Sequence, residues 1–168
     1  MLKILTPITK KIVTAVVGER VEISGIIYTA RDAIMPKISK LIENDMFDRL
    51  PIIFEGAAIL HTAVSHAGFG PTSSNKAEIE GSMGLLSKAG VKLHLGKGAI
   101  QQKTVDIITK YDAIYVVVPP VSALLQDSLI SKKIVAYPEE GMEALYELKV
   151  KNLPGVIAAA NGVSIFNR

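Results

Sequence analysis

The chain has 168 residues, of which 49% are hydrophobic and 21% are charged, and this composition excludes an intrinsically disordered protein. Nineteen Lys and Arg residues against sixteen Asp and Glu residues give a net charge of +3. The basic residues are spread along the chain, so we expect no nucleic-acid partner and a surface that favours small anions.

The sequence offers few ligands for a metal ion. It contains no cysteine, which excludes disulfides and any thiolate-bound metal or iron–sulfur cluster held by this chain alone. Its three histidines, His61, His66 and His94, are too few and too scattered to predict a zinc site. His66 and His94 lie in apolar stretches, where we interpret them as core or surface residues with satisfied hydrogen bonds.

No segment predicts insertion into a membrane. The opening residues, MLKILTPITKK, lack the apolar region of a signal peptide. The longest apolar runs are far shorter than the ~20 residues that a membrane-spanning helix needs. We therefore expect a cytoplasmic protein without a membrane partner, folded as one domain over residues 1–168.

The first half of the chain predicts strands alternating with a helix. Residues 20–28 carry apolar side chains at alternating positions, which indicates a strand, and Gly25 suggests a β-bulge in it. Apolar positions over residues 34–42 recur with the helical period, and Pro36 suits the first turn of that helix. Residues 51–60 predict the next strand.

The second half continues this alternation. Residues 79–86 repeat the helical period, and residues 91–95 predict a strand. Residues 113–120 are continuously apolar and β-branched, which is typical of a strand buried on both faces. The alternation as a whole predicts an α/β domain with a partly parallel sheet. The remaining predicted elements are a short helix around residues 105–108, a helix capped by Ser122, and strands over residues 132–137 and 155–160.

Polar residues gather at three predicted junctions between a strand and a helix. Arg31 lies in the segment TARDA, Lys76 follows the hydroxyl residues of GPTSSNK, and Lys97 lies between two glycines. In α/β sheets, ligands collect where strands end and helices begin, and helix N-termini favour anions. The guanidinium of Arg31 suits a carboxylate, and the two lysines supply point charges.

Each cluster also has a purely structural interpretation. Arg31 and Asp32 suit a local salt bridge or a helix cap. The hydroxyls of residues 72–74 suit a helix cap, and Gly-Lys-Gly at residues 96–98 suits a tight turn with a solvated lysine. The full phosphate-binding loop pattern is absent, and no catalytic triad follows from the spacing. The residues alone thus predict an anion-binding domain without a defined reaction.

Six segments occur in order along almost the whole chain: ILTPIT, SGIIYTARDA, GPTSSNK, GVKLHLGKGAI, EEGMEALYELKV and NLPGVIAAANGVSIF. Together they resemble the β subunit of the two-subunit class I fumarases and L-tartrate dehydratases, which is equivalent to the C-terminal domain of the single-chain class I enzymes. The resemblance implies the swivelling β/β/α domain that aconitases also contain.

The same resemblance implies a hydro-lyase, most simply one that hydrates fumarate to L-malate. In such enzymes a 4Fe–4S cluster acts as a Lewis acid, and its cysteine ligands belong to the α subunit. This chain would then bind no metal and would form a hetero-oligomer with an α subunit that carries the cluster. Its other partner would be a small dicarboxylate substrate.

The resemblance also assigns roles to individual residues. The family motif G-P-T-T-x-x-R-M places its catalytic threonine at Thr72. A hydroxyl is a poor base unless cations stabilise its alkoxide, and Lys76 and Lys97 would supply those cations while holding the substrate. Arg31 would clamp a substrate carboxylate.

Two positions depart from the family pattern. Met35 stands where the family has a histidine proposed as proton donor, and Lys76 replaces an arginine. A histidine of the partner subunit could then supply the acid, or the substrate could be a related 2-hydroxy acid such as tartrate. The alternative function is a non-catalytic subunit of the same fold that binds a carboxylate or stabilises a partner.

Overall fold

The computed structural model describes residues 1–12, 14–65, 68–69 and 76–167. The strands are β1 (Leu2–Thr6), β2 (Arg20–Thr29), β3 (Ala58–Leu60), β4 (Val64–Ser65), β5 (Gly68–Phe69), β6 (Leu93–Gly96), β7 (Ile114–Val117), β8 (Leu129–Ala136), β9 (Leu145–Ala160) and β10 (Val163–Ser164). The α-helices are α1 (Met35–Glu43), α2 (Lys76–Ala89), α3 (Gln102–Thr109) and α4 (Ser122–Asp127), and the 3₁₀ turns are η1 (Phe47–Arg49) and η2 (Pro138–Glu143).

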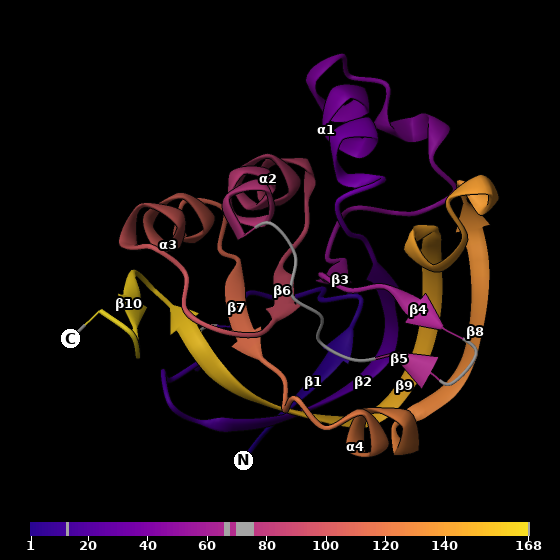
Figure 1. Ribbon diagram of the computed structural model, residues 1–168. Helices are drawn as coiled ribbons and strands as arrows, with labels where there is room; N and C mark the ends of the chain where they lie inside the picture. Colours follow the sequence, from indigo (N-terminus) through magenta and orange to yellow (C-terminus); the bar gives the residue numbers. More distant parts are fainter. Residues whose placement is uncertain (13, 66–67, 70–75, 168) are drawn as a thin grey trace.

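The main sheet closes on itself. Strands β1, β2, β3, β6 and β7 pair in this order, and all of these pairs are parallel. The long strand β9 pairs antiparallel with β7 near its end and with β2 along most of its length. The strands β2, β3, β6, β7 and β9 therefore form a closed ring, while β8 and β10 extend it as additional partners of β9 (Figure 1).

Side-chain alternation separates the inside of the ring from its outer face. Leu93 and Leu95 of β6 are fully buried in the apolar cluster that also contains Ile23 and Val116. His94 lies between these two leucines and therefore points to the opposite face. Tyr115, its neighbour on β7, packs in a separate cluster with side chains of α2 and α3. The ring is thus filled with apolar side chains, whereas His94 and Tyr115 lie on its outer face.

The helices α1, α2 and α3 lie side by side over this outer face (Figure 1). The apolar positions of α1, Ile38 and Ile42, pack in one cluster with Ile59 of β3 and Leu86 of α2. The third cluster joins Met83 of α2 to the apolar side of α3. This packing confirms the helical periods predicted over residues 34–42, 79–86 and 105–108.

The α/β class and the partly parallel sheet are confirmed as well. Gly25 has a φ of +118°, and the pairing of β2 with β9 shifts register beside it, so the predicted bulge is present. Among the helices of the described residues, none has the length and apolarity to span a bilayer.

Three predicted elements differ in the structure. The strand predicted over residues 51–60 is limited to β3 because Gly56 turns the chain, with a φ of +74° and its carbonyl bonded to the Ile8 N–H at 2.7 Å. The strand predicted over residues 155–160 is only the end of β9, which begins at Leu145. Ser122 is the first residue of α4 rather than its cap, since the N-cap is Val121 without a side-chain hydrogen bond.

Candidate functional site

Three polar residues follow the carboxyl ends of parallel strands and lie at one edge of the sheet. Two of them, Arg31 and Lys97, were predicted from the sequence as substrate-binding residues. Arg31 follows β2, His61 follows β3 and Lys97 follows β6. The backbone pairing continues past the strand ends, because the Ala30 N–H donates to the Leu60 carbonyl at 3.1 Å and the His61 N–H donates to Leu95 at 3.0 Å. This edge is where α/β proteins bind ligands.

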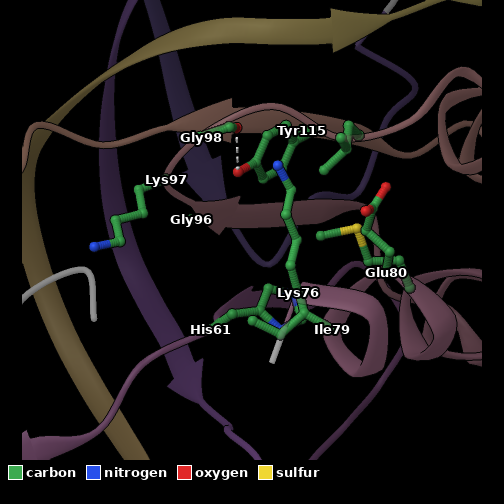
Figure 2. Close-up of a pocket in the computed structure, with 10 residues that line it drawn as sticks. His61, Lys76, Ile79, Glu80, Gly96, Lys97, Gly98 and Tyr115 are labelled. Atoms are coloured by element: carbon green, nitrogen blue, oxygen red, sulfur yellow. Dashed lines mark hydrogen bonds between the residues drawn. The ribbon is translucent and has the colours of Figure 1, made fainter. Parts of the chain in front are cut away.

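A cavity of about 290 Å³ lies at this edge, between α2 and the outer face of β6 and β7 (Figure 2). Its lining combines apolar side chains with two cations, one carboxylate, one imidazole and one phenol. The residues that line it are Lys76, Ile79, Glu80 and Met83 of α2, together with His61, Gly96, Lys97, Gly98, Ile100 and Tyr115.

The two predicted lysines reach this cavity from different elements. Lys76 is the first residue of α2, and its side chain extends toward Tyr115 and Gly98 (Figure 2). A Cβ added at Gly98 would lie 3.9 Å from the Lys76 Nζ. Lys97 lies in the bend after β6, and in Figure 2 its side chain runs away from Tyr115. The structure thus brings Lys76 and Lys97 to one cavity, with their amines pointing in different directions.

The bend that carries Lys97 is tied to the sheet by Tyr115. Gly98 has a φ of +74°, a conformation that favours glycine, and its carbonyl accepts a 3.1 Å hydrogen bond from the Tyr115 hydroxyl. Burial, and secondarily the charge of Glu80, raises the pKa of Tyr115, which keeps the hydroxyl protonated as a donor. The chain therefore bends where the sequence predicted a tight turn, and the bend also lines the cavity.

Glu80 supplies the one carboxylate among the residues described for the lining, and it also holds two helices together. Its Oε1 accepts hydrogen bonds from the Gln101 N–H at 2.6 Å and from the Thr104 hydroxyl at 2.9 Å. Glu80 therefore satisfies donors at the start of α3, as a helix cap does. The sequence pattern did not single this residue out, because its partners lie more than twenty positions away.

A buried row of polar side chains leads from α2 to the cavity. The Ser87 Oγ lies 2.8 Å from the His94 Nε2, and the His94 Nδ1 lies 3.4 Å from the His61 Nε2. Burial lowers the pKa of His61 to about 4, and burial together with the neighbouring ring lowers the pKa of His94 as well. Both rings are therefore neutral at pH 7.

The structure confirms the interpretation of one histidine, gives a second an unexpected position, and does not describe the third. His94 is a fully buried core residue with hydrogen-bond partners, as the sequence predicted. His61 was considered only as a metal ligand in the sequence, and the structure makes it a lining residue of the cavity. His66 lies outside the described residues. Within the described ranges, no three His, Cys, Asp or Glu side chains group in a way that suits a metal ion.

The remaining predicted residues do not line the cavity in the described part of the chain. The Arg31 Nε lies 3.8 Å from the Glu143 Oε1 of η2. Met35 is 3% exposed and packs in the apolar cluster of α1, so it faces the core. Thr72 falls in residues 70–75, which are outside the described residues, and its role stays a prediction.

The family model described as the fumarase C-terminus matches residues 2–168. The chain belongs to this family. The match confirms the resemblance seen in the sequence motifs. It covers the whole of the fold described above, including the cavity and every strand of the closed ring.

Among the individual relatives, some are named fumarate hydratases and one is named a tartrate dehydratase subunit. The chain is 28% identical to "Fumarate hydratase 2" of Leishmania major and 28% identical to "Fumarate hydratase class I, anaerobic" of Escherichia coli (strain K12), over 84% of its length in both cases. It spans only 26% and 27% of those proteins. It is 30% identical to the "Putative L(+)-tartrate dehydratase subunit beta" of Methanocaldococcus jannaschii, covering 95% of this chain and 88% of that protein.

Proposed function

We propose that this member of the fumarase C-terminus family is the β component of a two-part hydro-lyase that hydrates fumarate to L-malate. The observation that carries the proposal is the placement of Lys76 and Lys97, from different elements, around one cavity at the carboxyl ends of the parallel strands. Two ammonium groups that point in different directions suit a dianion whose charges lie at its two ends. The names of the relatives support a hydro-lyase.

Within this proposal, the chain binds the substrate and takes up a proton from it. Lys76 and Lys97 pair with the substrate carboxylates, and Arg31 exchanges its ion pair with Glu143 for a carboxylate when the site closes. Thr72 stands four positions before Lys76 in the sequence. In the dehydration direction its alkoxide accepts the proton from the carbon next to a carboxylate, with the lysines stabilising the negative charge.

A 4Fe–4S cluster is the cofactor that the family implies, and this chain does not fit it. The sequence contains no cysteine, and the described residues offer no group of metal-ligating side chains. We therefore propose that the cluster belongs to a cysteine-bearing α subunit and derive no step of the reaction through it. The partner would cover the cavity and complete the site in a hetero-oligomer.

We also propose that residues 1–168 form one domain of the swivelling β/β/α type and act in the cytoplasm. The closed ring of strands, with α1, α2 and α3 on its outer face, supports this fold. The motion that gives such domains their name would let the partner and the cavity approach each other around the bound substrate.

The second candidate is a non-catalytic carboxylate-binding or assembly subunit. The observation that favours it is Met35, whose buried side chain stands where the family has a proposed proton donor and cannot transfer a proton. A dehydratase for tartrate or another 2-hydroxy acid is a narrower variant of the first proposal, and the name of the Methanocaldococcus jannaschii relative supports it.

The test is to assay the chain alone and together with a cysteine-bearing α subunit under anaerobic conditions, with fumarate, malate and tartrate. We expect no turnover by the chain alone and hydration of fumarate by the assembled pair. Turnover of tartrate alone would select the narrower variant. A correctly assembled pair that binds dicarboxylates but converts none of them would replace the proposal with the non-catalytic candidate.

A further inference from the structure

His61 is a buried residue of the cavity lining. The residue is 3% exposed, yet it is part of the cavity lining. Its Nε2 is occupied by the contact with His94 at 3.4 Å, a long hydrogen bond. Its Nδ1 is buried and has no hydrogen-bond partner among the residues that the structure describes. A buried nitrogen in this state is costly unless a ligand satisfies it.

The tautomer of His61 follows from the other end of the row. The buried hydroxyl of Ser87 needs an acceptor, and its hydrogen-bond partner in the described structure is the His94 Nε2 at 2.8 Å. When Ser87 donates to this nitrogen, the His94 proton sits on Nδ1 and is donated to the His61 Nε2. The His61 proton must then sit on Nδ1.

The opposite arrangement leaves a group unsatisfied. If the His94 Nε2–H donated to Ser87, the hydroxyl proton of Ser87 would need a second acceptor, and the structure gives it none in its described part. Three polar groups in a row therefore orient one another, and the hydroxyl in the protein core decides which form of His61 meets the cavity.

We propose that His61 presents its Nδ1–H to the cavity as a fixed, uncharged donor for a carboxylate oxygen of the substrate, with Ser87 setting this tautomer through His94. The proposal rests on the proposed function, because that function supplies the dicarboxylate. It adds a substrate-positioning residue and two residues that act through it.

An uncharged donor complements the lysines. Lys76 and Lys97 attract a dianion through charge. They fix the orientation of the dianion only weakly, because an ammonium group can bind an anion from many directions. An imidazole N–H that is held by buried partners has a single direction. The side chain of His61 is also neutral at pH 7, since burial lowers its pKa to about 4, so it donates without adding charge.

The first test reads the tautomers directly. Nitrogen-15 NMR of the full chain, without ligand, should show both His61 and His94 protonated on Nδ1. In Ser87→Ala, which leaves the cavity lining intact, the orienting donor is lost and both rings should redistribute toward the Nε2–H form. His61 protonated on Nε2 in the unsubstituted chain would overturn the proposal.

The second test adds succinate, a C4 dicarboxylate that cannot be hydrated, with its neutral diamide as the control ligand. Succinate should shift the His61 Nδ1–H resonance, and the diamide should shift it far less. His61→Phe should weaken succinate binding by roughly tenfold, whereas His61→Asn, which keeps an N–H donor near the same place, should restore much of it. An unshifted Nδ1–H resonance at saturating succinate would overturn the proposal even if the variants fail to fold.

These outcomes are separable from those of the proposed function. The tautomer and succinate measurements need no partner and no turnover. A correct tautomer and a succinate-shifted Nδ1–H resonance with an inactive assembled enzyme would reject the hydro-lyase reaction and keep His61 as a carboxylate donor. An active enzyme with the Nε2–H tautomer would keep the reaction and reject the role of His61.

Discussion

The Tyr115 hydroxyl of β7 donates a hydrogen bond of 3.1 Å to the Gly98 carbonyl, and this contact fixes the bend that holds Lys97. A Cβ added at Gly96 would lie 3.1 Å from the same hydroxyl, so the bend and the phenol are closely packed. The placement of a candidate substrate-binding lysine thus depends on a side chain from the neighbouring strand.

Replacement of this phenol should loosen the bend without disturbing the ring. In Tyr115→Phe the aromatic packing remains and one hydrogen bond is lost, so the free energy of unfolding should fall by about 1 kcal/mol. Binding of succinate should weaken, because Lys97 is no longer held in place. Chemical denaturation and calorimetric titration measure the two effects. Tyr111→Phe, at a tyrosine outside the cavity lining, is the matched control and should change neither.

Two substitutions of Glu80 should have different effects on the free energy of unfolding and on the affinity for succinate. Glu80→Ala removes the acceptor for the Gln101 N–H and the Thr104 hydroxyl, and we expect a loss of about 1 kcal/mol, as for other helix caps. Glu80→Gln keeps an acceptor oxygen but removes a negative charge from the lining, so it should unfold almost normally and bind succinate roughly fivefold more tightly.

Glu78→Gln provides the control for this charge effect. Glu78 lies in the first turn of the same helix and is not part of the cavity lining. If Glu78→Gln tightens succinate binding as much as Glu80→Gln does, the effect arises from net charge and not from the position of Glu80.

The lysines should matter by position rather than by charge alone. Lys97→Gln should raise the KM of the assembled enzyme by roughly tenfold or more, because a charge-assisted contact with the substrate is lost. Lys103→Gln makes the same change of charge at an exposed position of α3 outside the lining. Steady-state kinetics at several salt concentrations compare the two, and equal effects would place substrate binding elsewhere.

Thr72 should affect the chemical step. If it is the base, Thr72→Ala should lower kcat by ~10²–10⁴-fold with a small change in KM, since Lys76 and Lys97 still hold the substrate. If it only caps a helix, the substitution should cost about 0.5–2 kcal/mol of stability and leave turnover of the folded enzyme unchanged. Ser73→Ala, at the next hydroxyl, should keep kcat within a small factor of the original.

The buried histidines should make the protein less stable in acid. The folded-state pKa of His61 is about 4, below the value of 6.5 for an exposed histidine, because burial disfavours its charged form. Between these pH values the unfolded chain binds more protons than the folded one. The stability associated with His61 is therefore complete above pH 6.5 and is lost as the pH falls toward 4, by roughly 3 kcal/mol.

Urea unfolding at a series of pH values between 7.5 and 4.5 measures this loss. His61→Gln cannot titrate, so the slope of the unfolding free energy against pH should decrease by roughly one proton. An unchanged slope would mean that His61 has the same pKa in the folded and the unfolded chain.

Much of the architecture was predictable from local patterns. The helical period over residues 34–42 and the alternation over residues 20–28 depend on side chains three, four or two positions apart, and both elements appear in the structure. The glycine that suggested a bulge in β2 lies at a register shift. Where prediction failed, over residues 51–57, the chain turns at Gly56 against the backbone of Ile8, a contact that no local pattern reveals.

The sequence by itself determined the class of fold, the family through its ordered motifs, and the types of residue that could bind an anion. Only the tertiary structure decided which of them share a cavity. Lys76 and Lys97 both line it, Arg31 pairs with Glu143, and Met35 packs into the core. The row from Ser87 through His94 to His61 joins a helix, a strand and the end of another strand. Such contacts form when the sheet closes and the helices pack on it. They cannot be predicted from the spacing of residues along the chain.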